Sequence, residues 1–263
     1  NQKANFANML LTDTHTHQYY EKDLSKREEQ MRRCFDNGVK RLFLPNVDVA
    51  SIAMIDEMVK TYPENCFAMA GLHPCDVKDD YQSVLAEIYA SIADRKIYAI
   101  GEIGIDLYWD KTTLAIQQDA VKQQIEWAKQ LDLPFVIHCR EAFDEVFEVL
   151  EETNHDKMRG VFHCFTGNVE QGKRAIDLGF YLGIGGVVTY KKAGLDLVLA
   201  DIPLEHIVLE TDSPFLAPVP FRGKPNESSY LLHVAQKVAD IYVKDVEEIA
   251  EITTENSRKI FGI

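Results

Sequence analysis

The sequence of 263 residues is 46% apolar and 27% charged, which is long for one sandwich or helical bundle and suits a single α/β barrel or two domains. Its 28 Lys and Arg against 42 Asp and Glu give a formal net charge of −14, so the protein is not built to coat long duplex nucleic acid. The five cysteines are odd in number and show no CxxC spacing, which argues against a disulfide scaffold and indicates a reducing, cytoplasmic setting.

The longest apolar run, at 180–188, is interrupted by glycines and is far shorter than a membrane span. Residues 1–8 are polar and precede Met9, and we set them aside as a native leader or a cloning remnant. The remainder, 9–263, contains no Pro- or Ser-rich linker and no fixed-period repeat. We therefore expect one domain over 9–263.

Short apolar segments alternate with amphipathic ones along the chain. We expect eight strands, at 9–11, 39–47, 66–72, 97–100, 134–137, 161–162, 180–184 and 207–209. Helices are predicted after the first seven strands, at 25–35, 50–61, 79–93, 112–131, 141–152, 169–178 and 195–200. Two more helices, 229–242 and 246–261, follow the eighth strand after a loop rich in Pro and Gly at 215–226.

These strands are apolar on both faces, as expected for a parallel sheet that is buried on both sides. Eight strand–helix units with connections of this length predict a single closed (β/α)8 TIM barrel. An open, doubly wound sheet is the alternative architecture. It is disfavoured because no glycine-rich dinucleotide fingerprint follows the first strand.

Two histidines follow the first strand. Alternate side chains of a strand share one face, so His15 and His17 should point the same way, with Asp13 one step behind them. Neutral imidazoles that converge at a strand end are suitable ligands for a divalent metal ion. A pair of solvated histidines is the plainer interpretation of this stretch taken alone.

More side chains of the metal-ligand type fall at the predicted carboxyl ends of other strands. A TIM barrel gathers its catalytic groups at that rim, so residues far apart in the sequence would meet there. Six candidates share this position: His15, His17, Glu102, His138, His163 and Asp212. Six ligands exceed the need of one tetrahedral ion, and we therefore predict two divalent ions.

Glu102 is the predicted bridge between the two ions, since the fourth strand lies between the two sets of ligands. His15, His17 and Asp212 would hold one ion, and His138 and His163 the other. Asp212 has a second predicted role, in which it holds and deprotonates the attacking water. Imidazole ligands suit zinc, whereas a carboxylate bridge and phosphate chemistry also suit manganese or magnesium.

Seven motifs spread over the chain belong together: DTHTH (13–17), GLHP (71–74), GEIGID (101–106), IHCR (137–140), GVFHCFTG (160–167), ETDSP (210–214) and RGKPNE (222–227). With them the sequence resembles the TatD-type metal-dependent hydrolases, deoxyribonucleases of the amidohydrolase superfamily, over nearly its whole length from Met9. This resemblance implies a (β/α)8 barrel, a dinuclear divalent-metal site on the six residues named above, and hydrolysis of phosphodiester bonds in DNA.

Four further residues are candidates for binding substrate. His73 follows the third strand and would donate to phosphate or shuttle a proton, with a structural histidine as the alternative. Arg140 should point inward, where a guanidinium suits bidentate phosphate binding better than a salt bridge at the rim. Arg222 and Lys224 lie after the eighth strand, where barrels often bind phosphate; a solvated pair of charges is the alternative.

Other residues near the predicted rim have less specific patterns. Tyr108 and Trp109 would either stack on a base or cover the barrel mouth. Cys139 and Cys164 each follow a predicted ligand by one residue, so strand alternation places them toward the helices as packing residues.

The leading hypothesis is a divalent-metal-dependent deoxyribonuclease that cleaves phosphodiester bonds with metal-activated water, as an exonuclease on single-stranded ends. DNA ends or short single-stranded nucleic acid would be its partners, without a stable protein partner or a membrane. The same site could instead hydrolyse a small ester, lactone or amide. Arg140 and the basic loop favour phosphate, whereas the net charge leans mildly the other way. A noncatalytic metal-binding module is a third hypothesis, disfavoured because structural metal sites are closed by protein ligands.

Overall fold

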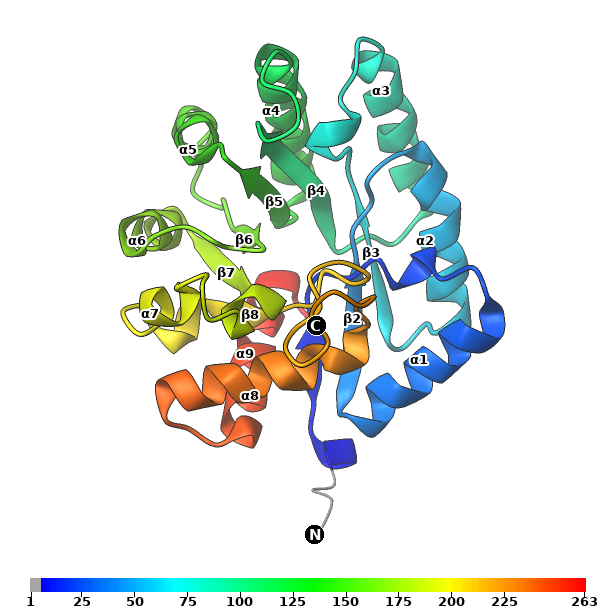
Figure 1. Ribbon diagram of the computed structural model, residues 1–263. Helices are drawn as coiled ribbons and strands as arrows, with labels where there is room; N and C mark the ends of the chain where they lie inside the picture. The colour runs from blue at the N-terminus through cyan, green and yellow to red at the C-terminus, as the bar shows by residue number, and fades with distance from the viewer. Residues whose placement is uncertain (1–5) are drawn as a thin grey trace, which may run out of the picture.

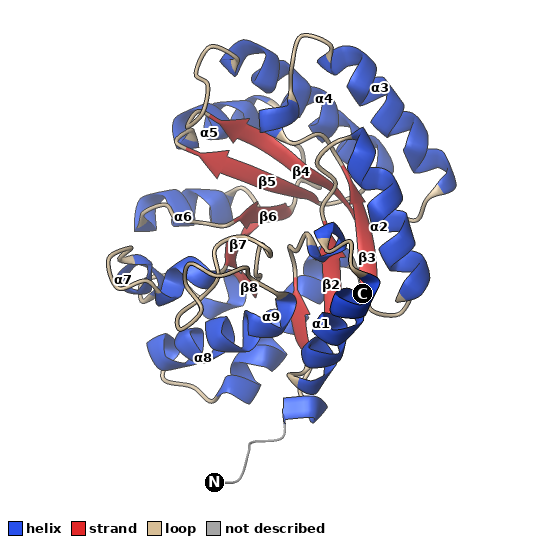
Figure 2. Ribbon diagram, turned by 45° about the vertical axis from the view of Figure 1, so that its right-hand side comes forward, coloured by secondary structure: helices blue, strands red, loops and turns tan. Residues whose placement is uncertain are grey.

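The computed structural model describes residues 6–263 and shows a ring of strands surrounded by helices (Figures 1 and 2). The strands are β1 (Leu11–Asp13), β2 (Val39–Leu44), β3 (Cys66–Ala70), β4 (Ala99–Asp106), β5 (Phe135–Arg140), β6 (Gly160–His163), β7 (Phe180–Ile184) and β8 (Ile207–Leu209). They lie in chain order, and all seven consecutive pairings are parallel. The predicted (β/α)8 barrel is therefore confirmed. The predicted leader, 1–8, lies outside the described residues apart from 6–8, which form a 3-10 turn.

The helices on the outside of the ring are α1 (Leu24–Asp36), α2 (Val49–Thr61), α3 (Tyr81–Ser91), α4 (Leu114–Leu131), α5 (Phe143–Glu152), α6 (Val169–Asp177), α7 (Leu195–Leu199), α8 (Leu231–Tyr242) and α9 (Val246–Phe261). Local sequence fixes where several of them begin. At α2, Asp48 accepts a hydrogen bond from Ser51 N while Ser51 Oγ accepts one from Asp48 N, which satisfies two amides that the helix leaves unpaired. Among the helices of residues 6–263, none has both the length and the apolar character needed to cross a bilayer.

Side chains of the strands point alternately into the barrel and toward the helices. The inward cluster consists of Phe43, Phe67, Met69, Ala99, Val136, Val161 and Val208, with Ile260 and Phe261 from α9. The rings of Phe43 and Phe261 stack with centroids 4.1 Å apart. The end of α9 therefore packs against the interior of the barrel.

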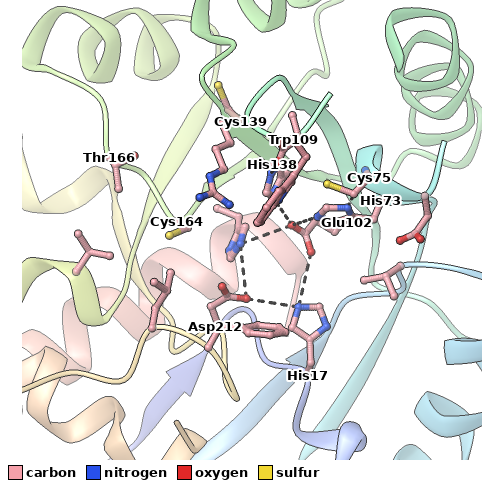
Figure 3. A pocket seen from close by; sticks show the side chains of 18 of the residues that line it. His17, His73, Cys75, Glu102, Trp109, His138, Cys139, Cys164, Thr166 and Asp212 are labelled. Atoms are coloured by element: carbon pink, nitrogen blue, oxygen red, sulfur yellow. Dashed lines mark hydrogen bonds and ion pairs between the residues drawn. The ribbon is translucent and has the colours of Figure 1, made fainter. Parts of the chain in front are cut away.

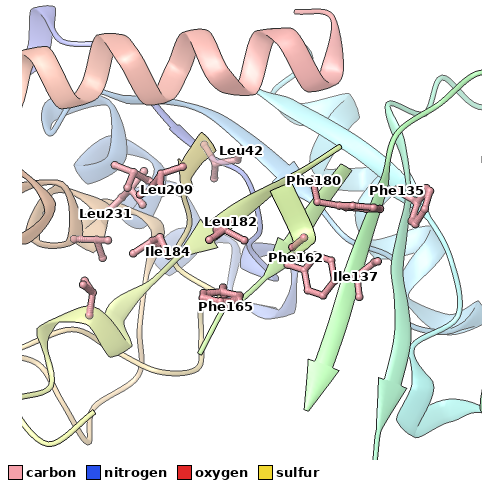
Figure 4. Packing of buried hydrophobic residues seen from close by; sticks show 14 of the residues in the cluster. Leu42, Phe135, Ile137, Phe162, Phe165, Phe180, Leu182, Ile184, Leu209 and Leu231 are labelled. Carbon is pink, nitrogen blue, oxygen red and sulfur yellow. The ribbon is translucent and has the colours of Figure 1, made fainter. Parts of the chain in front are cut away.

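The outward faces of the strands pack against the helices in the main hydrophobic core (Figure 4). The Phe180 ring meets Phe135 and Phe162 edge to face, with centroids 5.2 and 5.3 Å away. Gly160 pairs with Phe135 and Phe180 in the sheet. A Cβ atom on Gly160 would lie 1.9 Å from the Phe135 carbonyl oxygen, so the close strand packing at this point requires glycine.

The predicted fourth strand was too short. The sequence indicated 97–100 with Glu102 just beyond its end, whereas β4 continues to Asp106 and contains Glu102. Its second half pairs with β5, from Ile103 opposite Ile137 to Asp106 opposite Arg140. Glycines such as those of the GEIGID motif weaken a strand, but β5 provides hydrogen-bond partners there.

The barrel closes between β8 and β1 through a few specific hydrogen bonds. Asp212 N donates to His15 O at 2.9 Å. The fully buried carboxylate of Asp13 accepts hydrogen bonds from Thr211 N (2.9 Å) and Thr211 Oγ1 (2.6 Å). This seam holds the residues after β1 beside the residues after β8, which is where His15 and Asp212 meet.

Replacing Thr211 with Val should remove one donor from the buried Asp13 carboxylate and lower the free energy of unfolding by about 1–3 kcal/mol. Thr253→Val is the matched control, because Thr253 is similarly buried but its hydroxyl donates to Ile249 O within α9. The control should lose less than about 1 kcal/mol. Urea unfolding of both variants measures the difference, and equal losses would contradict a special role of the seam.

Candidate active site

Most of the predicted site residues meet around one cavity of about 590 Å³ at the carboxyl ends of the strands (Figure 3). Strand alternation explains why. Val136 and Val161 point into the barrel, so His138 and His163, two residues further along, point into it as well. Of the six predicted ligands, five line the cavity: His17, Glu102, His138, His163 and Asp212. The sixth, His15, is completely buried next to Glu102.

Glu102 lies at the centre of this cluster and is 2% exposed. Its Oε2 atom lies 3.1 Å from His15 Nε2 and 3.7 Å from His17 Nε2. Its Oε1 atom lies 2.9 Å from His138 Nδ1 and 3.6 Å from His163 Nε2. The two carboxylate oxygens thus face different imidazoles, Oε2 those of His15 and His17 and Oε1 those of His138 and His163, with His73 also beside Oε1. A carboxylate that bridges two metal ions needs this arrangement.

Asp212 lies beside the first pair of histidines. Its Oδ1 atom is 3.4 Å from His17 Nε2 and 3.7 Å from His15 Nε2. A positive φ of 55° at Asp212 turns the chain sharply after β8, and Asp is one of the few residues that tolerate this conformation. Its side chain is 14% exposed, so one face of the carboxylate remains open to the cavity.

Three sets of residues bring possible ligand atoms within 4.8 Å of one another: His15, His17 and Asp212; His15, Glu102 and His163; and His73, Glu102 and His138. The first set matches the prediction for one ion. The predicted pair of His138 and His163 is not among the sets found in residues 6–263, and these two rings lie 6.2 Å apart. Glu102 Oε1 lies near both, so it connects them. Imidazole nitrogens and carboxylate oxygens that lie this close together are suitable ligands for divalent metal ions.

A contact with the Tyr19 hydroxyl holds the His17 ring in one orientation. Tyr19 OH donates to the backbone oxygen of Pro45 at 2.6 Å, and it lies 2.8 Å from His17 Nδ1. Because the Tyr19 hydrogen is already used, His17 Nδ1 must carry the hydrogen of the second bond. The Nε2 lone pair of neutral His17 is then free to face Glu102 and Asp212 as a metal ligand.

Two carboxylates that the sequence interpretation missed lie behind the other histidines. Asp106 Oδ2 is 2.8 Å from His138 Nε2, and the completely buried Glu210 has Oε1 2.9 Å from His163 Nδ1. Carboxylates in this position orient metal-binding histidines and increase their basicity. The sequence did contain a signal for both, because each lies an even number of residues from a predicted ligand, Asp106 after Glu102 and Glu210 before Asp212.

The carboxylates of the cluster are ionised despite their burial. Burial would raise the pKa of Glu102, but the neighbouring histidines, His73 most strongly, hold it well below its usual range. Burial would likewise raise the pKa of Asp212, which His163 lowers. Burial would lower the pKa of His163, but the carboxylate of Glu210 and those beyond it raise it to about 10. Divalent ions would replace the protons that balance these carboxylates, so the electrostatics also fit a metal site.

His73 lies beside the cluster, with Nε2 3.4 Å from Glu102 Oε1. Its Nδ1 atom accepts a hydrogen bond from Cys75 N at 3.0 Å. Nε2 carries a hydrogen in the protonated ring and, because Nδ1 accepts this bond, in the neutral ring as well; a nitrogen that carries hydrogen can donate to an oxygen but cannot coordinate a metal. This geometry favours the predicted role of His73 as a donor over a role as a seventh ligand.

The basic residues predicted to bind substrate are divided between two places. Arg140 lines the cavity, and its guanidinium carbon lies 3.8 Å from the centroid of the Tyr108 ring. Arg222 and Lys224 are exposed and do not line the cavity; Arg222 packs over the Tyr190 ring at 4.4 Å. Among the four predicted substrate contacts, His73 and Arg140 therefore lie beside the metal-ligand cluster, whereas Arg222 and Lys224 lie outside it.

The two cysteines that follow predicted ligands differ from each other. Cys139 packs against the main hydrophobic core, as strand alternation predicted, and also borders the cavity. Cys164 lines the cavity, which the prediction of a packing residue missed. Its φ of 47° turns the chain at the end of β6, so strand alternation no longer holds there.

A TIM barrel with an open cavity that gathers histidines and carboxylates at its strand ends has the architecture of a metal-dependent hydrolase. The model of the TatD-related DNase family matches residues 12–262 of this chain. The chain therefore belongs to the TatD-related DNase family.

Relatives agree with this assignment. The chain is 40% identical to YabD, a metal-dependent hydrolase of Bacillus subtilis, over 97% of this chain and 100% of that protein. It is 33% identical to TatD of Citrobacter rodentium, a 3'-5' ssDNA/RNA exonuclease, over 90% of this chain and 92% of that protein. The crystal structure of YjjV, a TatD homologue from Escherichia coli, matches with a TM-score of 0.90 at 28% identity, covering 96% of this chain and 98% of that one. The protein is thus a TatD-family metal-dependent hydrolase.

Replacing Glu102 with Gln should lower the occupancy of both predicted metal ions, because one neutral amide cannot bridge two cations as a carboxylate does. His163→Ala should empty chiefly one position. Glu227→Gln is the matched control, since Glu227 is also a buried glutamate but pairs with Arg33 outside the cavity. Elemental analysis after dialysis against one defined ion counts the bound metal. Two ions retained by Glu102→Gln would contradict the bridge.

Replacing Asp106 with Asn should weaken metal binding by about 10- to 100-fold, because the amide no longer holds and polarises the His138 ring as a carboxylate does. Asp119→Asn is a control on the exposed face of α4, where Asp119 accepts a hydrogen bond from Tyr81. Competition with a chelator dye measures both affinities. An unchanged affinity in Asp106→Asn would show that the contact with His138 plays no part in metal binding.

Proposed function

We propose that the protein hydrolyses phosphodiester bonds of DNA at single-stranded ends, with two divalent ions held by His15, His17, Glu102, His138, His163 and Asp212. The observation that supports it most is that Glu102 turns one oxygen to each pair of histidines within the cavity that also contains Arg140. Two adjacent cations and a guanidinium together suit a phosphodiester, which carries a negative charge before and during its cleavage.

Divalent ions bound there would supply Lewis acidity and lower the pKa of the attacking water. Asp212 is the group that holds this water and accepts its proton, because its carboxylate is ionised and partly open to the cavity. As the new P–O bond forms, the P–O bond to the departing sugar breaks and the leaving oxygen takes up a proton. His73 Nε2–H, on the other side of Glu102, is the donor available to a phosphate oxygen or to the leaving group.

A short single strand suits this protein better than duplex DNA. The net charge of −14 disfavours contacts with many phosphates, and Arg140 is the one Lys or Arg that lines the cavity in the described part of the chain. The exonuclease activity named for TatD of Citrobacter rodentium is of the same kind. We further propose a cytoplasmic protein that needs no stable protein partner.

Hydrolysis of a small ester, lactone or amide is the second candidate, because the same residues would activate water against any of these groups. Arg140 distinguishes the two candidates. Its guanidinium has no ion pair within residues 6–263 and is free to bind an anionic phosphate, whereas a neutral ester offers it no charge. A noncatalytic metal site is disfavoured by the open cavity beside Asp212.

Metal-stripped protein should be inactive, and defined divalent ions should restore hydrolysis of single-stranded DNA. Asp212→Asn, reloaded with the same ion, should lower kcat by about 10²- to 10⁴-fold because the water loses its base. Asp119→Asn should keep wild-type rates. The test panel contains single-stranded DNA, duplex DNA, RNA, a generic phosphodiester, a lactone and an amide. Full activity without metal would reject the proposal, and turnover of the lactone or amide alone would favour the second candidate.

A further inference from the structure

Two exposed aromatic side chains stand at the rim of the cavity on the loop after β4. Trp109 is 73% exposed and Tyr108 is 48% exposed, although burial of these rings would be favourable. The rings meet edge to face with centroids 4.8 Å apart, and Trp109 lines the same cavity as Glu102 and Asp212 (Figure 3). Fold stability does not account for a bare indole beside a cluster of metal-ligand residues.

This loop is anchored to the site. Asp106 Oδ1 accepts a hydrogen bond from Tyr108 N at 2.9 Å, while its Oδ2 atom contacts His138 Nε2. One carboxylate therefore fixes both a proposed metal ligand and the start of the aromatic loop. A ligand held by Trp109 would be held at a defined place relative to the metal cluster.

Arg140 connects the aromatic pair to the cluster. Its guanidinium carbon lies 3.8 Å from the Tyr108 ring centroid and 5.7 Å from that of Trp109. A guanidinium stacked on an aromatic ring keeps its N–H groups along its edge, where they can donate to a phosphate. No carboxylate of residues 6–263 forms an ion pair with it.

Apolar side chains also border the cavity on the loop after β8. Phe215 and Leu216 are 52% and 40% exposed and belong to the cavity lining. The Phe215 ring lies 5.9 Å from that of His17. The metal-ligand cluster is thus bordered by exposed aromatic rings on two different loops.

Resting on the proposed function, we propose that Trp109 and Tyr108 form a stacking subsite for one unpaired nucleobase, with Arg140 on the phosphate next to it. A nucleotide joins a flat aromatic base to an anionic phosphate. The base matches the indole of Trp109, and the phosphate matches the guanidinium of Arg140 and the metal-ligand cluster beside it. A base inside a duplex has both faces covered by its neighbours and cannot stack on Trp109. Since few phosphates can be bound by this acidic protein, stacking supplies the missing affinity.

The test uses oligonucleotides that lack a single base. Wild-type metal-loaded protein is given a single strand with either an intact 3' or 5' terminal nucleotide or an abasic one at the same position. Loss of the stacked base should raise KM roughly tenfold at one of the two ends. Trp109→Ala should raise KM for the intact strand by a similar factor and should reduce the ratio of abasic to intact KM toward one. Trp109→Phe should restore most of that ratio.

Tyr89→Ala is the matched control, because Tyr89 is also an exposed aromatic residue but lies on α3 away from the cavity. Its ratio of abasic to intact KM should equal that of the wild type. If the abasic nucleotide raises KM by the same factor in Trp109→Ala as in the wild type, the two changes act independently. Trp109 then does not contact the base, and the subsite is rejected.

A binding measurement separates this inference from the catalytic proposal. The protein has two tryptophans, so Trp127→Phe leaves Trp109 as the sole indole. Short single-stranded DNA with phosphorothioate linkages, which resist hydrolysis, should quench Trp109 fluorescence when it is added to this variant loaded with metal, and the same backbone without bases should not. Quenching without hydrolysis of any oligonucleotide by the metal-loaded enzyme would reject the proposed nuclease and leave the subsite supported. Hydrolysis without quenching would reject the subsite alone.

Discussion

The site depends on one buried charge. Glu102 lies inside the barrel with each carboxylate oxygen directed at a different pair of imidazoles, and a lone buried carboxylate would be very costly. The cost is offset only because positive charge converges on it, from protons on the histidines or from metal ions. Asp106 and Glu210 add an outer layer of negative charge, since Asp106 contacts His138 and Glu210 contacts His163, two histidines that face Glu102. The histidine rings are therefore held from both sides, which orients their nitrogens before any ion binds.

Closure of the barrel completes this cluster. His15 and Asp212 are nearly 200 residues apart in the sequence, and they become neighbours because Asp212 N donates to His15 O across the seam. The buried Asp13 carboxylate holds the same seam through Thr211. Stability and chemistry thus depend on the same few hydrogen bonds, because a loosened seam would separate ligands contributed by β1 and β8. For that reason the first residue of the DTHTH motif, Asp13, matters although it does not line the cavity.

The sequence sufficed for the barrel and for the six clustered residues, since both follow from the two-residue period of strands and from the meeting of strand ends at one rim. It did not suffice for Asp106 and Glu210, because a carboxylate at a strand end has the same pattern whether it binds metal, orients a histidine or contacts solvent. The prediction for Cys164 was wrong because its positive φ ends the alternation of side chains along β6. Cysteine has no special preference for this conformation, so the sequence did not indicate it. Arg222 and Lys224 were predicted to bind phosphate because they follow the eighth strand, but the part of the loop that carries them does not line the cavity.

The proposed nuclease activity requires an acidic protein to attract an anionic substrate, and the arrangement of charges around the cavity offers a way to do so. Among the Lys and Arg residues of 6–263, Arg140 lines the cavity, and the ions that the cluster would hold would add their charge beside it, so attraction would be strongest within a few ångströms of the scissile bond. A long duplex gains little from so small a positive region and its stacked bases cannot reach Trp109. A frayed terminal nucleotide can place its phosphate at the cluster and its base on the indole at the same time. Selectivity for chain ends would then follow from two features together: the small positive region at the cavity and the lack of a larger positive surface that could bind duplex DNA.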